Sequence, residues 1–209
     1  MIGAMIIAVD GSAASGKGTL SKRLADHFNL AYLDTGSLFR ALALQLLNAG
    51  TVIDDIDENQ PIEESTRLDV GLCNAPEIRT DRVASLASKV AILPEVRTNL
   101  LTLQRNFAND PPHGNGAVLD GRDIGSVVVP ETPIKFFIDA KLEVRAERRF
   151  KELLHAGQSV MVRNVLADMR ERDQRDRTRS VAPLRAADGA KIIDTSTMDA
   201  DKVFAVALD

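Results

Sequence analysis

The sequence has little of several residue types, and each scarcity excludes a class of protein. Its 209 residues include one cysteine, Cys73, which excludes an intrachain disulfide and a cysteine-rich zinc site. Aromatic residues make up only 4% of the chain, and the formal net charge is −4. An RNA-binding protein is therefore disfavoured, because single-strand binders need stacking rings and a basic surface.

Long apolar segments are also missing from the sequence. No apolar run reaches the ~18 to 20 residues that cross a bilayer, and no charged leader precedes an apolar segment at the N-terminus. We therefore expect a soluble, cytoplasmic protein that binds neither membranes nor nucleic acids. We also expect a monomer. The 44% hydrophobic content is enough for a substantial core, and the length fits one α/β domain over residues 1–209.

Positive charge is present but concentrated. Arginines outnumber lysines 18 to 8, and 10 of the 18 arginines lie between Arg145 and Arg185. The planar guanidinium group donates two parallel hydrogen bonds to a phosphate or carboxylate. This segment therefore suits the recognition of small phosphorylated molecules.

A glycine-rich stretch follows the apolar run Met5–Val9 and precedes a helical pattern, which predicts a strand, a phosphate-binding loop (P-loop) and a helix. The backbone N–H groups of such a loop surround a polyphosphate, the helix N-terminus attracts it, and Lys17 reaches its outer phosphates. The hydroxyl of Thr19 is the candidate Mg²⁺ ligand. The residues of the loop are Gly11, Ser12, Ala13, Ala14, Ser15, Gly16, Lys17, Gly18 and Thr19. The loop predicts that the chain binds a nucleoside triphosphate.

Further short apolar segments alternate with helix-forming sequence along the rest of the chain. They span residues 31–33, 117–119, 134–138 and 191–194. This alternation predicts an α/β fold with a mostly parallel, five-stranded sheet between helices, in which ligands bind beyond the carboxyl ends of the strands. Five carboxylates come at or just after those ends and are expected to converge there: Asp34, Asp120, Asp123, Asp139 and Asp194.

The segment from Met161 to Arg179 predicts a helix whose inward row changes chemistry along its length. Val162, Val165 and Met169 begin the row, and its continuation is Arg172, Asp176 and Arg179. We expect these three charged residues to line a polar cleft. The other charges predict a solvated face with local pairs, such as Glu171 with Arg175 and Asp173 with Arg177.

Several blocks together resemble the cytidylate kinases of the bacterial type. They are residues 10–19, Asp34-Thr35-Gly36-Ser37-Leu38-Phe39-Arg40, Asp120-Gly121-Arg122-Asp123-Ile124-Gly125 and residues 172–183, in that order through nearly the whole chain. The resemblance implies a three-layer P-loop kinase fold and transfer of the γ-phosphoryl group of ATP to CMP or dCMP, with Mg²⁺ required. The small-molecule partners would be ATP, CMP and dCMP.

The resemblance also implies roles for residues on the acceptor side. Arg40, Arg122 and Arg179 would bind the CMP phosphate, and Arg172 and Asp176 its ribose. Ser88, Arg97 and Asp123 match the base-contacting positions, where the Asp123 carboxylate accepts from the cytosine amino group and would face a carbonyl oxygen of UMP. Thr35 keeps the hydroxyl of the serine that many members carry there, and it is a further substrate-binding candidate.

On the ATP side, the resemblance implies that Lys17, Arg145 and Arg149 approach the phosphates. Lys17, Arg122, Arg149 and Arg179 are the catalytic candidates. A plain charged helix, in which Arg145 and Arg149 pair with Glu143 and Glu147, is the alternative for the two lid arginines. The acceptor-binding region would span about 36–100 and a short lid about 148–163, and the insert between Asn48 and Arg79 is short, as if a β-hairpin were missing.

Three other functions stay open at this point. A related kinase would act on UMP, AMP or another small acceptor. A P-loop switch would change shape with its nucleotide, although the chain has no Asn-Lys-x-Asp sequence for reading guanine. An RNA-binding protein would use the arginine-rich helix, against the acidic total charge.

Overall fold

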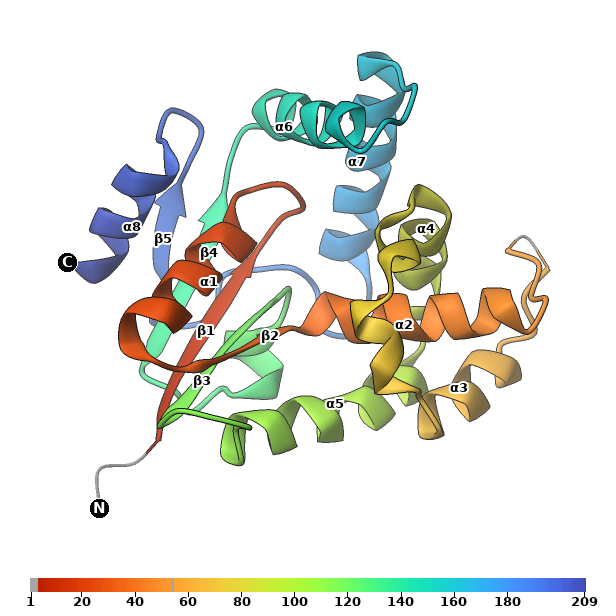
Figure 1. Ribbon diagram of the computed structural model, residues 1–209, viewed down its shortest axis with the longest axis horizontal. Coiled ribbons are helices and arrows are strands. Elements are labelled where there is room, and N and C mark those ends of the chain that lie inside the picture. The colour runs from red at the N-terminus through yellow and green to blue at the C-terminus, as the bar shows by residue number, and fades with distance from the viewer. Residues whose placement is uncertain (1–3, 54) are drawn as a thin grey trace. The chain divides into compact units, whose positions relative to one another are not determined.

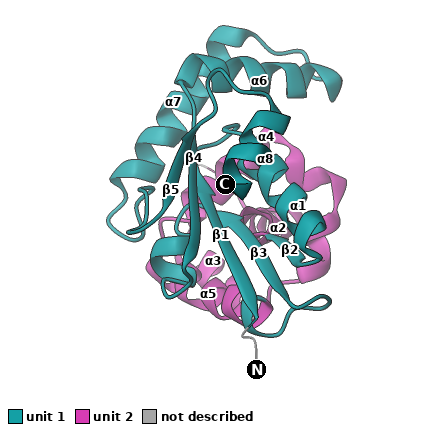
Figure 2. Cartoon of the chain, turned by 90° about the vertical axis from the view of Figure 1, so that its left-hand side faces the viewer, with its two compact units in different colours: residues 1–33, 108–209 teal, residues 34–107 magenta. Residues whose placement is uncertain are grey.

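The computed structural model describes residues 4–53 and 55–209, which form two compact units. Unit 1 contains the residues up to 33 and residues 108–209, and unit 2 contains residues 34–107 (Figure 2). The predicted single domain over residues 1–209 includes residues 1–3 and 54, which lie outside the described residues. The predicted acceptor region 36–100 includes residue 54.

The central sheet has the strand order β2-β3-β1-β4-β5. The strands are β1 (Met5–Gly11), β2 (Ala31–Asp34), β3 (Gly116–Gly121), β4 (Ile134–Asp139) and β5 (Lys191–Asp194). Strand β1 pairs in parallel with β3 and β4, and β4 pairs in parallel with β5. Buried Ile7, Val9, Val118, Ile138 and Ile193 form the core around them. The predicted five-stranded α/β architecture is confirmed.

Helix α1 (Lys17–Phe28) begins after the glycine-rich loop and buries Leu20 and Leu24 in the same core. It ends at Asn29, whose left-handed backbone (φ 51°) gives a C-cap that asparagine tolerates. Helix α8 (Ala200–Leu208) packs beside α1, and its N-cap Asp199 accepts a hydrogen bond from the backbone N–H of Lys202 at 2.8 Å.

Helices α6 (Leu142–His155) and α7 (Val162–Thr178) lie side by side in unit 1 (Figure 1). Ala146, Leu153, Val165 and Met169 form a small core between them. The predicted apolar start of the α7 row is thus confirmed at Val165 and Met169, whereas Val162 is exposed. A further short element of unit 1, η3 (Ile124–Val128), follows β3.

Apart from Asp34, which ends β2, the regular elements of unit 2 within the described residues are helices. Its elements are α2 (Thr35–Asn48), α3 (Asn59–Thr66), η1 (Val70–Asn74), η2 (Pro76–Arg79), α4 (Asp81–Val90) and α5 (Pro94–Asn109), which extends into unit 1. The buried faces of α2, α4 and α5 share one core that includes Leu42, Leu46, Leu86 and Leu100. The short insert between Asn48 and Arg79 therefore contains a series of short helices packed on α2.

No helix within residues 4–53 and 55–209 is long and apolar enough to cross a bilayer.

Candidate functional site

The P-loop connects β1 to α1 in a backbone conformation that depends on glycine. Gly16 has φ 92°, which side-chain-bearing residues rarely adopt. A Cβ at Gly11 would lie 2.0 Å from the backbone oxygen of Ile138 on β4, so only glycine fits there. The loop therefore has the strand-to-helix form that the sequence predicted.

Lys17 and Thr19 lie on the first turn of α1. The Nζ atom of Lys17 is 4.0 Å from Oδ1 of the buried Asp120, at the end of β3. The hydroxyl of Tyr32 donates to Oδ2 of Asp120 at 2.6 Å. This contact was not predicted from the sequence, because an aromatic residue in a strand gives no signal for the partner of its hydroxyl. The ammonium group of Lys17 thus lies near the carboxylate of Asp120, which the Tyr32 hydroxyl holds in place.

The oxygen atoms near this turn suit a hard divalent cation. Thr19 is exposed. Asp120 lies beside Gly18: a Cβ added to Gly18 would be 3.5 Å from Oδ2 of Asp120. Among residues 4–53 and 55–209, no cluster of three or more His, Cys, Asp or Glu side chains forms a protein-only metal cage. Such a donor set fits Mg²⁺, which keeps several waters and binds through one or two protein oxygens together with substrate phosphates.

Asp10 holds the segment that follows β3. Its carboxylate accepts hydrogen bonds from the backbone N–H groups of Ile124 at 2.7 Å and Gly125 at 2.8 Å. These bonds fix the turn that carries Arg122 and Asp123. Burial raises the pKa of Asp10 to about 7, since the loss of water outweighs the two hydrogen bonds.

The raised pKa of Asp10 predicts a pH-dependent stability. The native state holds a proton on Asp10 that the unfolded chain releases near pH 4, so the free energy of unfolding falls as the pH rises from about 4 to 7, by no more than about 4 kcal/mol. In Asp10→Asn this contribution is absent. Urea unfolding from pH 5 to 8 should show wild type losing stability relative to Asp10→Asn as the pH rises. A difference that stays constant over this range contradicts the raised pKa.

Arg122, Asp176 and Arg179 come together in unit 1. The Nε of Arg122 donates to Oδ2 of Asp176 at 3.0 Å, and Nη1 of Arg179 lies 3.8 Å from Oδ1 of the same carboxylate. Burial alone would raise the pKa of Asp176, but the guanidinium groups of Arg122, Arg172 and Arg179 outweigh it and lower that pKa. The predicted inward charged row of α7 is therefore present, and its arginines form with Arg122 a partly exposed cationic cluster around the buried carboxylate of Asp176.

The remaining charges of α7 do not all form the predicted solvated face. Glu171 pairs with Arg175, as expected. The predicted pair of Asp173 with Arg177 is wrong, because Asp173 receives two hydrogen bonds from the buried Arg145 at 3.1 and 2.5 Å. Arg177 pairs instead with Asp139 at 2.9 Å. The helical spacing rule considers only neighbours on one helix, so it misses partners on α6 and β4.

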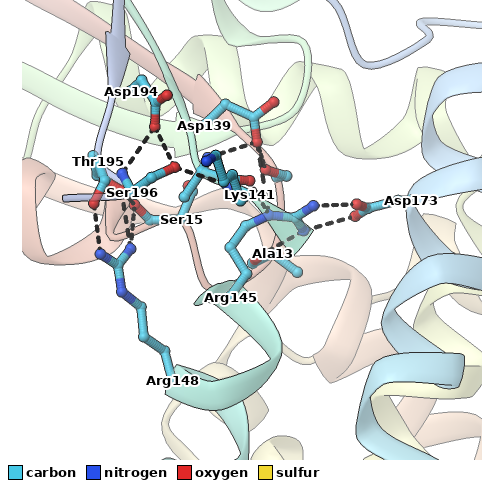
Figure 3. A network of polar contacts seen from close by, with 12 residues as sticks. Ala13, Ser15, Asp139, Lys141, Arg145, Arg148, Asp173, Asp194, Thr195 and Ser196 are labelled. Atoms are coloured by element: carbon cyan, nitrogen blue, oxygen red, sulfur yellow. Dashed lines mark hydrogen bonds and ion pairs between the residues drawn. The ribbon is translucent and has the colours of Figure 1, made fainter. Parts of the chain in front are cut away.

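Two of the three arginines of α6, Arg145 and Arg148, contact backbone oxygens of the P-loop (Figure 3). Arg145 donates to the backbone oxygen of Ala13 at 3.3 Å, and the alternative in which it pairs with Glu143 and Glu147 is wrong. Arg148 lies 3.5 Å from the backbone oxygen of Ser15 and donates to the Thr195 hydroxyl at 2.9 Å. Arg149 pairs with Glu152 at 3.4 Å on its own helix.

The contacts of Arg148 and Thr195 with the P-loop were not predicted from the sequence. Thr195 follows β5, is buried, and donates from its hydroxyl to the backbone oxygen of Ser15 at 2.8 Å. Its position beyond a parallel strand end was the available signal, since Asp194 beside it was predicted to lie at that edge. The carboxylate of Asp194 accepts from the backbone N–H of Ser196 at 2.8 Å and so shapes this turn.

The remaining acceptor-side candidates belong to unit 2. Arg40 on α2 forms an ion pair with Asp34, the N-cap residue of the same helix, and Thr35 is buried at its first turn. The buried Nε of Arg40 has no hydrogen-bond partner within the described residues.

Ser88 and Arg97 are also in unit 2. Ser88 is buried on α4, and Arg97 on α5 donates to the backbone oxygen of Ala91 at 3.1 Å. The guanidinium carbon of Arg97 lies 5.6 Å from the ring centre of Phe39, a cation–π contact that orients it.

The fold has a phosphate-binding loop at the end of β1, and a guanidinium cluster made by Arg122 after the neighbouring strand β3 and by Arg179 at the end of α7. Together they are the features of a P-loop phosphotransferase. A solved structure of an uncharacterized protein from Eubacterium ventriosum shares this fold, with a TM-score of 0.54 at 16% identity over 98% of this chain and 96% of that one. The cytidylate kinase family model matches residues 7–209.

Individual relatives agree with that match. A cytidylate kinase of Paramagnetospirillum magneticum is 51% identical over 97% of this chain and 95% of its own length. A cytidylate kinase of Rhodospirillum rubrum is 49% identical over 98% of this chain and 96% of its own length. The chain belongs to the cytidylate kinase family. This confirms the predicted family and the phosphotransferase class, with ATP as phosphoryl donor.

Proposed function

We propose that this protein transfers the γ-phosphoryl group of ATP to CMP or dCMP, forming ADP and CDP or dCDP. An oxygen of the acceptor phosphate attacks the γ-phosphorus, and the bond between that phosphorus and its bridging oxygen to ADP breaks. The observation that carries the proposal is the cluster of Arg122 and Arg179 around the buried Asp176, which would offer a second anion site in the unit that holds the P-loop. The curated relatives are named cytidylate kinases, which supports CMP as the acceptor.

On the donor side, the loop amides and Lys17 would bind the ATP phosphates. Phosphoryl transfer depends mainly on alignment and on neutralising charge, so these groups need no nucleophilic side chain beside them. The hydroxyl of Ser15 is buried and has no hydrogen-bond partner within the described residues, which fits a loop that binds a polar ligand. Arg149 remains a predicted ligand on the lid side.

Mg²⁺ is part of the proposal. Thr19 would hold the ion, and Asp120 would hold it directly or through water, while the phosphates complete its coordination. When bound, the ion neutralises phosphate charge during transfer.

On the acceptor side, Arg40, Arg122 and Arg179 would bind the CMP phosphate in line with the γ-phosphate. The buried Nε of Arg40 without a partner in the described structure favours this role, since an anionic ligand would satisfy it. Arg172 and Asp176 would bind the ribose, with the carboxylate accepting from sugar hydroxyls. Thr35 would add a hydroxyl on the same side.

Base selection would depend on Asp123, Ser88 and Arg97. Asp123 is buried in the turn after β3, which Asp10 fixes. An ionised carboxylate accepts the cytosine amino group, whereas it would face a carbonyl oxygen of uracil. Arg97 would donate to the ring acceptors of cytosine.

Two regions of the chain would have separate roles. Residues 36–100 would bind the acceptor, and residues 148–163, which include the connection between α6 and α7, would close as a lid that excludes water. All proposed residues come from one chain, so a monomer suffices. Because ATP and CMP are cytoplasmic metabolites, we propose a cytoplasmic location.

A coupled assay of ADP release tests the proposed function. Purified protein with ATP and Mg²⁺ is compared with CMP, dCMP, UMP, AMP or no acceptor. We expect ADP to form with CMP and dCMP and to form slowly with UMP or AMP. Equal ADP formation without any acceptor would instead identify an ATPase or a switch, and a preference for UMP or AMP would identify a related kinase.

Replacing Asp123 with alanine should relax the choice of base. We expect the ratio of kcat/KM for CMP to that for UMP to fall at least tenfold, because the repulsion of the uracil carbonyl and the hydrogen bond to the cytosine amino group, together worth ~1 to 3 kcal/mol or more, are both lost. Steady-state kinetics with both acceptors measure this ratio. An unaltered ratio would show that another group selects the base.

A further inference from the structure

The backbone of the P-loop is strained at one residue that is not glycine. Ala14 has φ 57°, in the left-handed region that residues with a Cβ avoid. Such a conformation persists only where the surroundings fix it. The neighbouring residues on both sides of Ala14 have their carbonyl groups held by side chains from distant parts of unit 1 (Figure 3).

On the N-terminal side, Arg145 holds the carbonyl oxygen of Ala13. The guanidinium group of Arg145 is buried, and each of its nitrogens has a protein acceptor: Nε donates to Ala140 at 2.8 Å, and the terminal nitrogens donate to Ala13 and to both carboxylate oxygens of Asp173. Asp173 on α7 therefore fixes the position of Arg145.

On the C-terminal side, Thr195 holds the carbonyl oxygen of Ser15 at 2.8 Å. Arg148 donates to the Thr195 hydroxyl and to the Thr195 backbone oxygen at 2.9 and 2.7 Å, which orients that hydroxyl. Two further contacts also hold the P-loop in place. The Ser12 hydroxyl donates to Asp139, and the side chains of Ala13 and Ala14 pack on the core between α6 and α7.

We infer that Arg145, Asp173 and Thr195 are positioning residues of the P-loop: they hold the Ala13 and Ser15 carbonyls on the outside of the loop, so that the loop amides face the ATP phosphates. The inference deepens the proposed function and depends on it for the identity of the donor. It also revises the role of Arg145, which acts on the loop and does not itself bind the phosphates. A guanidinium group whose nitrogens are all engaged by protein oxygens has little capacity left for a ligand.

The Asp173→Asn variant separates the two roles because they predict opposite effects. If Arg145 bound the phosphates directly, loss of the Asp173 charge would release Arg145 and lower or leave unchanged the KM for ATP. If Arg145 positions the loop, weakening its support raises the KM for ATP about tenfold, with the KM for CMP at saturating ATP unchanged within about twofold. Steady-state kinetics with each substrate varied in turn measure both constants.

Glu171→Gln is the matched control for that variant. It removes one negative charge from the same helix two residues away, at an exposed carboxylate that pairs only on the helix surface. We expect both KM values to match wild type.

Thr195→Val provides a second test without any change of charge. It keeps the shape of the side chain and removes the hydroxyl that reaches Ser15, so the KM for ATP should rise about fivefold, and Thr195→Ser should restore it. Thermal unfolding is measured for every variant. A lowered melting temperature with an unchanged KM for ATP in both Asp173→Asn and Thr195→Val would overturn the inference, as would a lowered KM for ATP in Asp173→Asn.

The wild-type protein in the same series keeps the two proposals apart. If wild type forms no CMP-dependent ADP, the proposed function is wrong. If wild type does so and both variants keep its KM for ATP, only the positioning role is wrong.

Discussion

Replacing Arg179 with alanine should lower kcat with CMP about a thousandfold, an effect of the size seen when an arginine that neutralises the transferred phosphoryl group is removed. Arg179 is the C-cap residue of α7, and its Nε donates to the backbone oxygen of Ala182 at 2.7 Å while its Nη1 lies near Asp176. These contacts hold its guanidinium in the cationic cluster. The KM for ATP should change less than about threefold, since the P-loop is untouched.

Two further variants make that result specific. Arg179→Lys keeps the charge but loses the forked geometry, so we expect an intermediate loss of kcat. Arg170→Ala removes an exposed arginine from the same helix and should leave kcat unchanged. Circular dichroism checks that each variant is folded. Turnover of Arg179→Ala with CMP at the wild-type rate would remove this residue from the reaction.

Replacing Lys17 with glutamine should lower kcat/KM for ATP about a thousandfold. The lysine supplies the one side-chain cation of the P-loop itself, and its ammonium group stabilises negative charge that spreads over the phosphates in the transition state. Initial rates at varied ATP and saturating CMP give this ratio.

Lys22→Gln is the control for Lys17→Gln. Lys22 is exposed on the same helix, so its loss tests whether total charge near α1 matters. We expect wild-type kinetics from it. If Lys17→Gln retained kcat/KM within about threefold of wild type, the loop would not bind the reacting phosphates through this residue.

The sequence predicted the P-loop region well because each part has a strong local cause. Apolar β-forming residues precede the loop, glycine is required at Gly11 and Gly16, and Asn29 ends the helix in a left-handed conformation. Part of the predicted convergence of carboxylates at strand ends is present, since parallel strands point the same way. Asp139 and Asp194 are paired in register, and Asp120 is paired with Val9 near the end of β1.

The region between α2 and α4 could not be predicted in the same way. Helices α3, η1 and η2 are short, and short helices have little stability of their own. They persist because Ile62, Leu72 and Ile78 pack on the core of unit 2. That packing depends on residues far apart in the sequence, which periodicity does not reveal.

The contacts that support the site were the least predictable part. Asp173 was expected to pair four residues along its own helix, but its partner Arg145 is 28 residues away on α6. Thr195 contacts Ser15 from 180 residues away. The first contact arises because α6 packs against α7, and the second because the ends of β1 and β5 lie at the same edge of the sheet. The fold therefore has to be known before such partners can be named.

We propose that one chain binds two anionic nucleotides, one through loop amides and one through arginines. A crystal structure with CMP and a non-hydrolysable ATP analogue tests it most directly. We predict the triphosphate within the amides of residues 11–19, and the CMP phosphate within hydrogen-bond distance of Arg40, Arg122 and Arg179. A CMP phosphate bound away from these three guanidinium groups would rule out the proposed acceptor site.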